Sequence, residues 1–220
     1  MVLSYADMQN VSLEEIQRYA KASKDALWEA AREYGRDVKI YLHWTAGHYG
    51  QFWDDYHLQI DEDGICYMPN NITLCDKIAG TYMRNSGSVA VAILGCFDAT
   101  TNKGLGTNPP TLAQIETMAR VIAVIAEALE FPIDIKHVMT HGEAADNEDG
   151  YLPEYQANGY PDGMYGPKHS VERWDLEYLG TKECPSYQPY ATNGCRGGDI
   201  LRGKAKWYHH EYDGEVEKYF

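Results

Sequence analysis

A nearly continuous apolar run, SVAVAILGCF, covers residues 88–97 and has the length of one β-strand. A strand without polar positions is buried on both faces, so this segment predicts the centre of a sheet that helices cover. Two shorter segments, 38–42 and 133–141, also have strand-like composition. We therefore expect an α/β fold built around a central sheet.

Two amphipathic segments supply helices for this sheet. The first covers residues 12–34, where Ser12 is the predicted N-cap and apolar residues return at helical spacing. The second covers residues 109–131, with Thr111 as its predicted N-cap. A Glu or Gln follows each cap three residues later, which is the pattern of a capping box. Each helix is expected to place one apolar face on the sheet.

The remaining sequence contains a hairpin signal and a long stretch of loop-forming residues. Apolar and polar residues alternate on both sides of Asp63 and Gly64, a dipeptide that favours a tight turn between antiparallel strands. From residue 142 to about 172 the chain is rich in Gly, Pro, Asp and Tyr, and we expect mostly loop. A short apolar segment follows within residues 197–212.

The segments predict one domain, because the chain has no internal repeat and no Gly/Ser-rich or Pro-rich linker. We expect this domain to cover residues 1–220. Its core is predicted at roughly 38–180, after the N-terminal helix of residues 12–34, and residues 181–220 form a C-terminal extension.

The net charge and the search for targeting signals bear on which partners and which location we expect. The formal net charge is −14, whereas nucleic-acid binding requires clustered cations, so we expect no nucleic-acid partner. The first residues, MVLSYADMQN, lack the basic and apolar regions of a signal peptide, and no apolar run is long enough to insert into a membrane. We expect cytoplasmic synthesis and free thiols, with a later Cys184–Cys195 link as one exception.

Two of the predicted strands end in histidine. His43 follows the strand KIYL, and His141 follows KHVMT. A catalytic zinc site uses three protein ligands, commonly histidines with a carboxylate or a thiolate, and leaves one position open. Asp175 and Cys184, which both lie after His141, are the two candidates for the third ligand.

Five motifs in sequence order give the chain a family resemblance. They are LHWTAG, YHLQIDEDGICY, GSVAVAILG, TLAQIETMARVIAVI and MTHGEAA, and they extend from residue 39 to about residue 145. Together they resemble the zinc N-acetylmuramoyl-L-alanine amidases of the amidase-2 and peptidoglycan recognition protein superfamily. The tail, ERWDLEYL followed by GGDILRGKAKWY, is similar to a phage-type branch of these enzymes. The resemblance implies a mixed central sheet flanked by helices, with one zinc ion per chain in a shallow groove.

The resemblance also implies zinc ligands. The histidine of the family's first motif falls on His43, and that of its last motif falls on His141. The third ligand comes from a short element with either a carboxylate or a thiolate. RWDL offers Asp175, which we prefer because it lies beside the phage-type tail, and KECPS offers Cys184.

Catalytic residues follow from the same resemblance. Such enzymes hydrolyse the amide between N-acetylmuramic acid and L-alanine of peptidoglycan, and a cation beside the zinc stabilises the oxyanion. Arg173 is our candidate for this cation, with Lys182 as the alternative. Some family members carry a glutamate base on the central strand, but Ala92 stands there. Tyr56 is the predicted orienting residue, and Glu143 is an alternative base.

Further residues are expected to line the groove and bind the glycan strand and stem peptide of peptidoglycan. They are Trp44, Thr45, Tyr82 and Asn85. The predicted function is a zinc amidase of the phage or prophage lytic type, which acts on the cell wall after release. Two alternatives remain at this point: an inactive peptidoglycan-binding module of the same fold, and an amidase that acts on soluble muropeptides.

Overall fold

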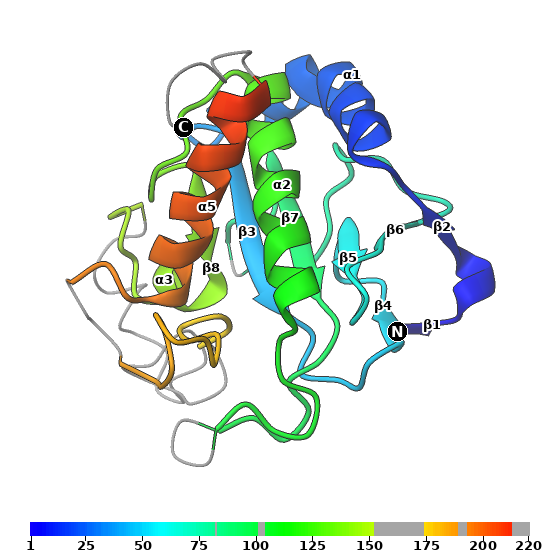
Figure 1. Ribbon diagram of the computed structural model, residues 1–220. Coiled ribbons are helices and arrows are strands. Elements are labelled where there is room, and N and C mark those ends of the chain that lie inside the picture. The colour runs from blue at the N-terminus through cyan, green and yellow to red at the C-terminus, as the bar shows by residue number, and fades with distance from the viewer. Residues whose placement is uncertain (82, 101–103, 152–173, 189–192, 213–220) are drawn as a thin grey trace.

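The apolar strand at the centre of the sequence also lies inside the sheet of the folded chain. The computed structural model describes residues 1–81, 83–100, 104–151, 174–188 and 193–212. Its main sheet has six strands in the order β2-β6-β5-β7-β3-β8 (Figure 1). The central strand β7 pairs in parallel with β5 and β3, and β3 pairs in parallel with β8. The edge pairs β5–β6 and β6–β2 are antiparallel, so the predicted mixed sheet is confirmed.

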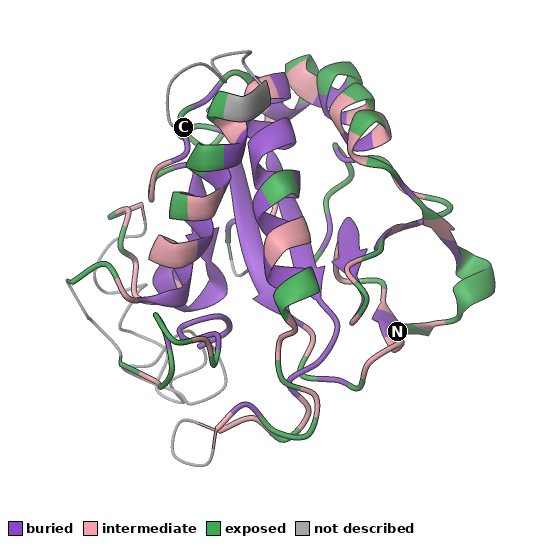
Figure 2. Ribbon diagram, in the orientation of Figure 1, coloured by how far each residue is buried: buried purple, intermediate pink, exposed green. Residues whose placement is uncertain are grey.

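The strands are short, and those at the centre are fully buried. The six strands are β2 (Met8–Asn10), β3 (Lys39–Trp44), β5 (Leu58–Ile60), β6 (Cys66–Pro69), β7 (Ser88–Ile93) and β8 (Val138–Thr140). Two further strands, β1 (Val2–Leu3) and β4 (Phe52–Trp53), form a separate antiparallel pair. Figure 2 shows β3, β5, β7 and β8 buried along their lengths, as expected for strands with both faces covered.

Three long helices cover one face of the sheet (Figure 1). They are α1 (Leu13–Arg32), α2 (Leu112–Leu129) and α5 (Gly197–Tyr212); the short elements are η1 (Tyr5–Asp7) and α3 (His141–Ala145). Both predicted capping boxes are present, because Ser12 and Thr111 each accept a hydrogen bond from the backbone three residues on. Flanking of the sheet by helices is therefore confirmed.

Alternate residues of β3 point to opposite faces of the sheet. Ile40, Leu42 and Trp44 belong to the apolar core shared with α1, α2 and α5. Tyr41 belongs to a separate small cluster, and His43 shares its face because side chains alternate along a strand. The strand therefore presents His43 on the face opposite the three long helices.

Several sequence-based boundaries differ from the structure. The strand predicted over 38–42 continues to Trp44, and the strand predicted to end on His141 stops at Thr140, where the capping of α3 begins. The hairpin is confirmed, with Gly64 in the left-handed region that the turn requires (φ 81°). The expected short segment near the C-terminus is instead the 16-residue helix α5.

The structure does not test two other expectations, the loop after residue 142 and the single domain. Most of the loop predicted after residue 142 lies outside the described residues. The single-domain organisation over residues 1–220 stays a prediction. Among the described residues, no helix combines the length and apolar character needed to cross a membrane.

A buried histidine, His57, stabilises the sheet through two hydrogen bonds to the backbone. His57 is 1% exposed; its Nδ1 accepts the Ala90 N–H at 3.0 Å, and its Nε2 donates to the Asp76 carbonyl at 2.9 Å. Burial lowers the pKa of His57 to about 4. The ring is therefore neutral in the folded protein at neutral pH.

This depressed pKa predicts a loss of stability in mild acid. The unfolded histidine binds a proton near pH 6.5 and the folded one only near pH 4, so the unfolded state is favoured as pH falls through this window. The contribution approaches about 3 kcal/mol at the acid end. Urea unfolding at pH 7, 5.5 and 4 should show a smaller acid loss for His57→Gln than for wild type. Equal losses in both proteins would contradict the assignment.

Candidate metal centre

Strand pairing brings the two strand-end histidines together. In the parallel pair β3–β8, Leu42 lies opposite Thr140. The next residue on each strand is a histidine, His43 on β3 and His141 at the start of α3. Because the strands are parallel, both side chains reach the same carboxyl edge of the sheet. The two histidines at predicted strand ends therefore lie side by side in the structure.

Asp175 completes a cluster of three buried side chains. His43 Nδ1 and His141 Nδ1 are 3.1 Å apart, and Asp175 Oδ2 lies 3.4 Å from the first and 3.2 Å from the second. Ligand atoms bound to one tetrahedral zinc at ~2.0–2.1 Å would be separated by about 3.3–3.4 Å. The three atoms therefore have the spacing and chemistry to hold one metal ion.

The charge of Asp175 suits a metal ligand. Burial alone would raise the pKa of this carboxyl group, but the adjacent His141 and His43 hold it at about 2. Asp175 is thus ionised at neutral pH, as a carboxylate ligand must be.

The ring of His43 has a second polar neighbour. Its Nε2 lies 3.4 Å from Thr81 Oγ1, on the side away from the cluster. Asn85 Oδ1 accepts the N–H groups of Gly80 at 3.1 Å and Thr81 at 2.7 Å, and so shapes the loop that carries this hydroxyl. Outer partners of this kind orient ligating histidines. Asn85, which the sequence predicted to bind substrate, therefore has a structural contact here, and its substrate contact stays a prediction.

Two tryptophans adjacent to ligands pack against each other. Trp44 follows His43 and Trp174 precedes Asp175, and their rings meet edge to face with centroids 4.9 Å apart. Trp174 also stacks on Tyr178 at 5.8 Å. Trp44 is only 4% exposed, and its side chain packs in the core below the end of β3. Its role in substrate binding stays a prediction.

Glu143 forms an ion pair and hydrogen bonds with its neighbours. Arg202 donates to both of its carboxylate oxygens, at 2.7 and 2.8 Å, and the Thr140 N–H donates to Oε2 at 3.0 Å. These contacts hold the start of α3, from which His141 projects.

The remaining predicted site residues have different surroundings. The ring centroid of Tyr56 lies 5.2 Å from that of His43, and its half-buried hydroxyl donates to the Trp44 carbonyl at 3.5 Å. Thr45 Oγ1 accepts the N–H groups of Gly47 and Gly95, so it shapes the turn after β3. Arg173 and Tyr82 lie outside the described residues.

Cys184, the alternative third ligand, is not part of the cluster. It is 2% exposed, and its thiol donates to the Glu177 carbonyl at 3.7 Å. Burial raises the pKa of this thiol to about 11, which disfavours the thiolate that metal binding requires. Cys184 and Cys195 are both free thiols, and Lys182 is exposed.

Sequence reasoning missed the partners of the ligands. Thr81, Trp174, Arg196 and Arg202 were not singled out. Thr81 contacts His43, and Trp174 directly precedes Asp175. Arg196 binds Glu177, and Arg202 binds Glu143. The available signal was indirect: Trp174 precedes a predicted ligand, and a buried Glu143 would require a cationic partner.

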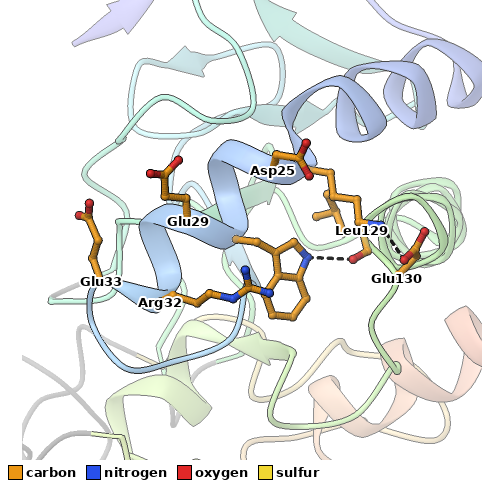
Figure 3. Close-up of a pocket in the computed structure, with 8 residues that line it drawn as sticks. Asp25, Glu29, Arg32, Glu33, Leu129 and Glu130 are labelled. Carbon is orange, nitrogen blue, oxygen red and sulfur yellow. Dashed lines mark hydrogen bonds and ion pairs between the residues drawn. The ribbon is translucent and has the colours of Figure 1, made fainter.

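A surface depression elsewhere is unrelated to this cluster. It lies between the second half of α1 and the end of α2, where Trp28 Nε1 donates to the Leu129 carbonyl (Figure 3). Gln114, at the other end of α2, donates to the carbonyls of Ile60 and Leu94 at the carboxyl ends of β5 and β7. The depression therefore lies toward the amino ends of the parallel strands, whereas His43 lies at their carboxyl ends.

Comparison with known protein families assigns the chain to one of them. The family Amidase_2, described as N-acetylmuramoyl-L-alanine amidase, matches residues 17–157, which is more than half of the sequence. The chain belongs to this family. The match contains His43 and His141 and ends before Asp175. The family resemblance seen in the five sequence motifs is thereby confirmed.

Other comparisons give partial overlaps. Two solved structures are similar: PGRP-Hd from Alvinella pompejana, and the Ph2119 endolysin from Thermus scotoductus MAT2119 bacteriophage Ph2119. The first is 18% identical, with 48% of this chain and 72% of that chain covered and a TM-score of 0.32. The second is 19% identical, with 48% and 70% covered and a TM-score of 0.30. No curated protein matches the sequence.

The burial of Cys184 predicts slow thiol labelling. Its raised pKa alone lowers the thiolate fraction by about 100-fold, and burial slows access further. With Ellman's reagent, the exposed Cys75 should react promptly in the native protein. The Cys184→Ala substitution should leave the amplitude of this prompt reaction unchanged. In denaturant, that variant should show one thiol fewer than wild type. A prompt native signal that disappears in Cys184→Ala would contradict the structure.

Proposed function

We propose that this chain is a zinc-dependent N-acetylmuramoyl-L-alanine amidase that cleaves peptidoglycan between N-acetylmuramic acid and L-alanine. Membership of the amidase family supports the reaction class. The observation that carries the proposal is the buried cluster of His43, His141 and Asp175. The similarity of the C-terminal tail to the phage-type branch supports a lytic role in a phage or prophage.

The ligand set fits a catalytic rather than a structural zinc. Two histidines and one carboxylate leave a fourth position for water or substrate, whereas structural zinc has four protein ligands. Bound zinc would supply Lewis acidity, which activates water near neutral pH and polarises a carbonyl. Asp175 contributes its negative charge to the site, and Thr81 orients the His43 ring.

Tyr56 is the residue that we assign to the reacting groups. Its ring lies beside the His43 ring, and its hydroxyl donates to the Trp44 carbonyl at 3.5 Å. A phenol in this position can donate to the developing oxyanion of the scissile amide. We propose Arg173 as the cation beside this oxyanion, with the exposed Lys182 as the alternative. Glu143 is assigned to positioning His141, because Arg202 engages both of its oxygens.

The reaction can be tested on purified sacculi. The protein should release new N-terminal alanine from peptidoglycan, lose this activity with a chelator and regain it with zinc. Asp175→Ala should lower kcat/KM by more than about 100-fold, because the metal contributes several kcal/mol. Sacculi that are bound without new amino termini would indicate a binding module, and new reducing ends would indicate a glycosidase.

The role of Tyr56 has its own test. Tyr56→Phe should lower kcat by about 100-fold with little change in KM, as expected for the loss of one oxyanion donor. Tyr49→Phe is a matched control, because Tyr49 is also half-buried and its hydroxyl donates to the Pro109 carbonyl. Equal effects of the two substitutions would remove Tyr56 from the mechanism.

A further inference from the structure

Two buried glutamates follow metal-ligand candidates at the same spacing. Glu143 lies two residues after His141, and Glu177 lies two residues after Asp175. Each is 1% exposed. A buried carboxylate requires a charged or hydrogen-bonding partner. The C-terminal segment supplies these partners as arginines.

Arg196 connects the two ligand-bearing segments. It binds both carboxylate oxygens of Glu177, from Nε at 2.9 Å and from Nη2 at 2.6 Å. The same guanidinium contacts Asp146 at 3.3 Å and Glu148 at 2.9 Å, where the helix that starts at His141 ends. One planar side chain therefore links the Asp175 turn to the far end of α3.

The two segments are also in direct contact. A Cβ placed on Gly142, directly after His141, would overlap the carboxylate of Glu177. A Cβ on Gly198 would lie 2.5 Å from the oxygens of Glu143. Glycine at these positions therefore allows α3, the Asp175 turn and α5 to approach closely.

A second arginine, Arg202, binds the end of β8 and the start of α3. Arg202 donates to the Val138 carbonyl at 3.0 Å and to both oxygens of Glu143, as described above. Within the described part of the chain, it contacts β8, the start of α3 and its own helix, where it also binds Asp199. Among the described residues, Arg196 is thus the arginine that binds both sides of the contact between α3 and the Asp175 turn.

We propose that Arg196 is a positioning residue of the metal centre, which holds Asp175 at the distance from His141 that a metal ion requires. This inference rests on the proposed metal-dependent function. Residues around the ligands fix their geometry, and their loss typically lowers metal affinity by about 10- to 100-fold. Arg196 and Glu177 lie beyond residues 17–157, whereas Asp146 and Glu148 lie within them, so Arg196 links the part of the chain that the family match covers to the part that it does not.

The test compares metal affinity with stability. The variants are Arg196→Met, which removes the guanidinium, Arg196→Lys, which keeps one charge, and Gly142→Ala, which separates the two segments without removing a charge. Lys204→Met is the control, because it removes another cation from α5, one that pairs with Glu116 of α2. Zinc dissociation constants are measured by chelator competition, cobalt absorption reports coordination, and thermal unfolding of the metal-free proteins reports the fold.

We expect the zinc dissociation constant to rise about 10- to 100-fold in Arg196→Met, with a smaller rise in Arg196→Lys. Gly142→Ala should also weaken zinc binding, although alanine favours the helix by about 1 kcal/mol. Lys204→Met should keep the wild-type zinc affinity, whatever its effect on the unfolding temperature.

Three outcomes would overturn the inference. One is unchanged zinc affinity and an unchanged cobalt spectrum in folded Arg196→Met. If Arg196→Met does not fold, unchanged affinity in Gly142→Ala would have the same meaning. An equal loss of affinity in Lys204→Met would reduce Arg196 to a general stabilising residue. Failure of the wild type to bind zinc would instead contradict the proposed function, so the two failures are distinguishable.

Discussion

The parallel pairing of β3 with β8 is the constraint on which the candidate site depends. The register that places Leu42 opposite Thr140 sets His43 beside His141. A shift of one residue would send one of the side chains to the other face of the sheet. The apolar face of β3, packed under α1 and α2, keeps this register because any slip would expose core residues. Core packing thus fixes the spacing of the two nitrogen atoms that are candidate metal ligands.

The third ligand depends on contacts of another kind. Asp175 lies in a turn without regular backbone pairing, so side chains have to position it. Trp174 packs on Trp44 from one direction, and Arg196 binds Glu177 from another. The turn is therefore held on both sides of the ligand, by an apolar contact before it and an ionic contact after it.

Much of the fold and two members of the cluster, His43 and His141, could be predicted from the sequence because their signals are local. The run around β7, the two capping boxes and the hairpin at Gly64 each depend on residues close in sequence. The helix α5 was expected only as a short apolar segment, since its glycines, Gly197 and Gly198 among them, have low helix propensity. Gly197 and Gly198 allow α5 to approach Leu176 and Glu143 closely, so tertiary contact outweighs propensity at these two positions.

The partners of the ligands could not be predicted, because their contacts join distant parts of the chain. Thr81 lies 38 residues from His43, and Arg196 lies about 50 residues from Asp146. The choice between Asp175 and Cys184 had the same limit. Both follow a plausible local motif, and only the folded chain shows that the thiol points to the Glu177 carbonyl while the carboxylate meets the histidines.

Bound zinc per chain, measured by elemental analysis after reconstitution, tests the central claim most directly. Wild type, Asp175→Ala and Cys184→Ala should be purified side by side. The account predicts about one zinc per chain in wild type and in Cys184→Ala, and a clear loss in Asp175→Ala. Zinc that is lost with Cys184→Ala but retained in Asp175→Ala, or absent from wild type, would contradict it.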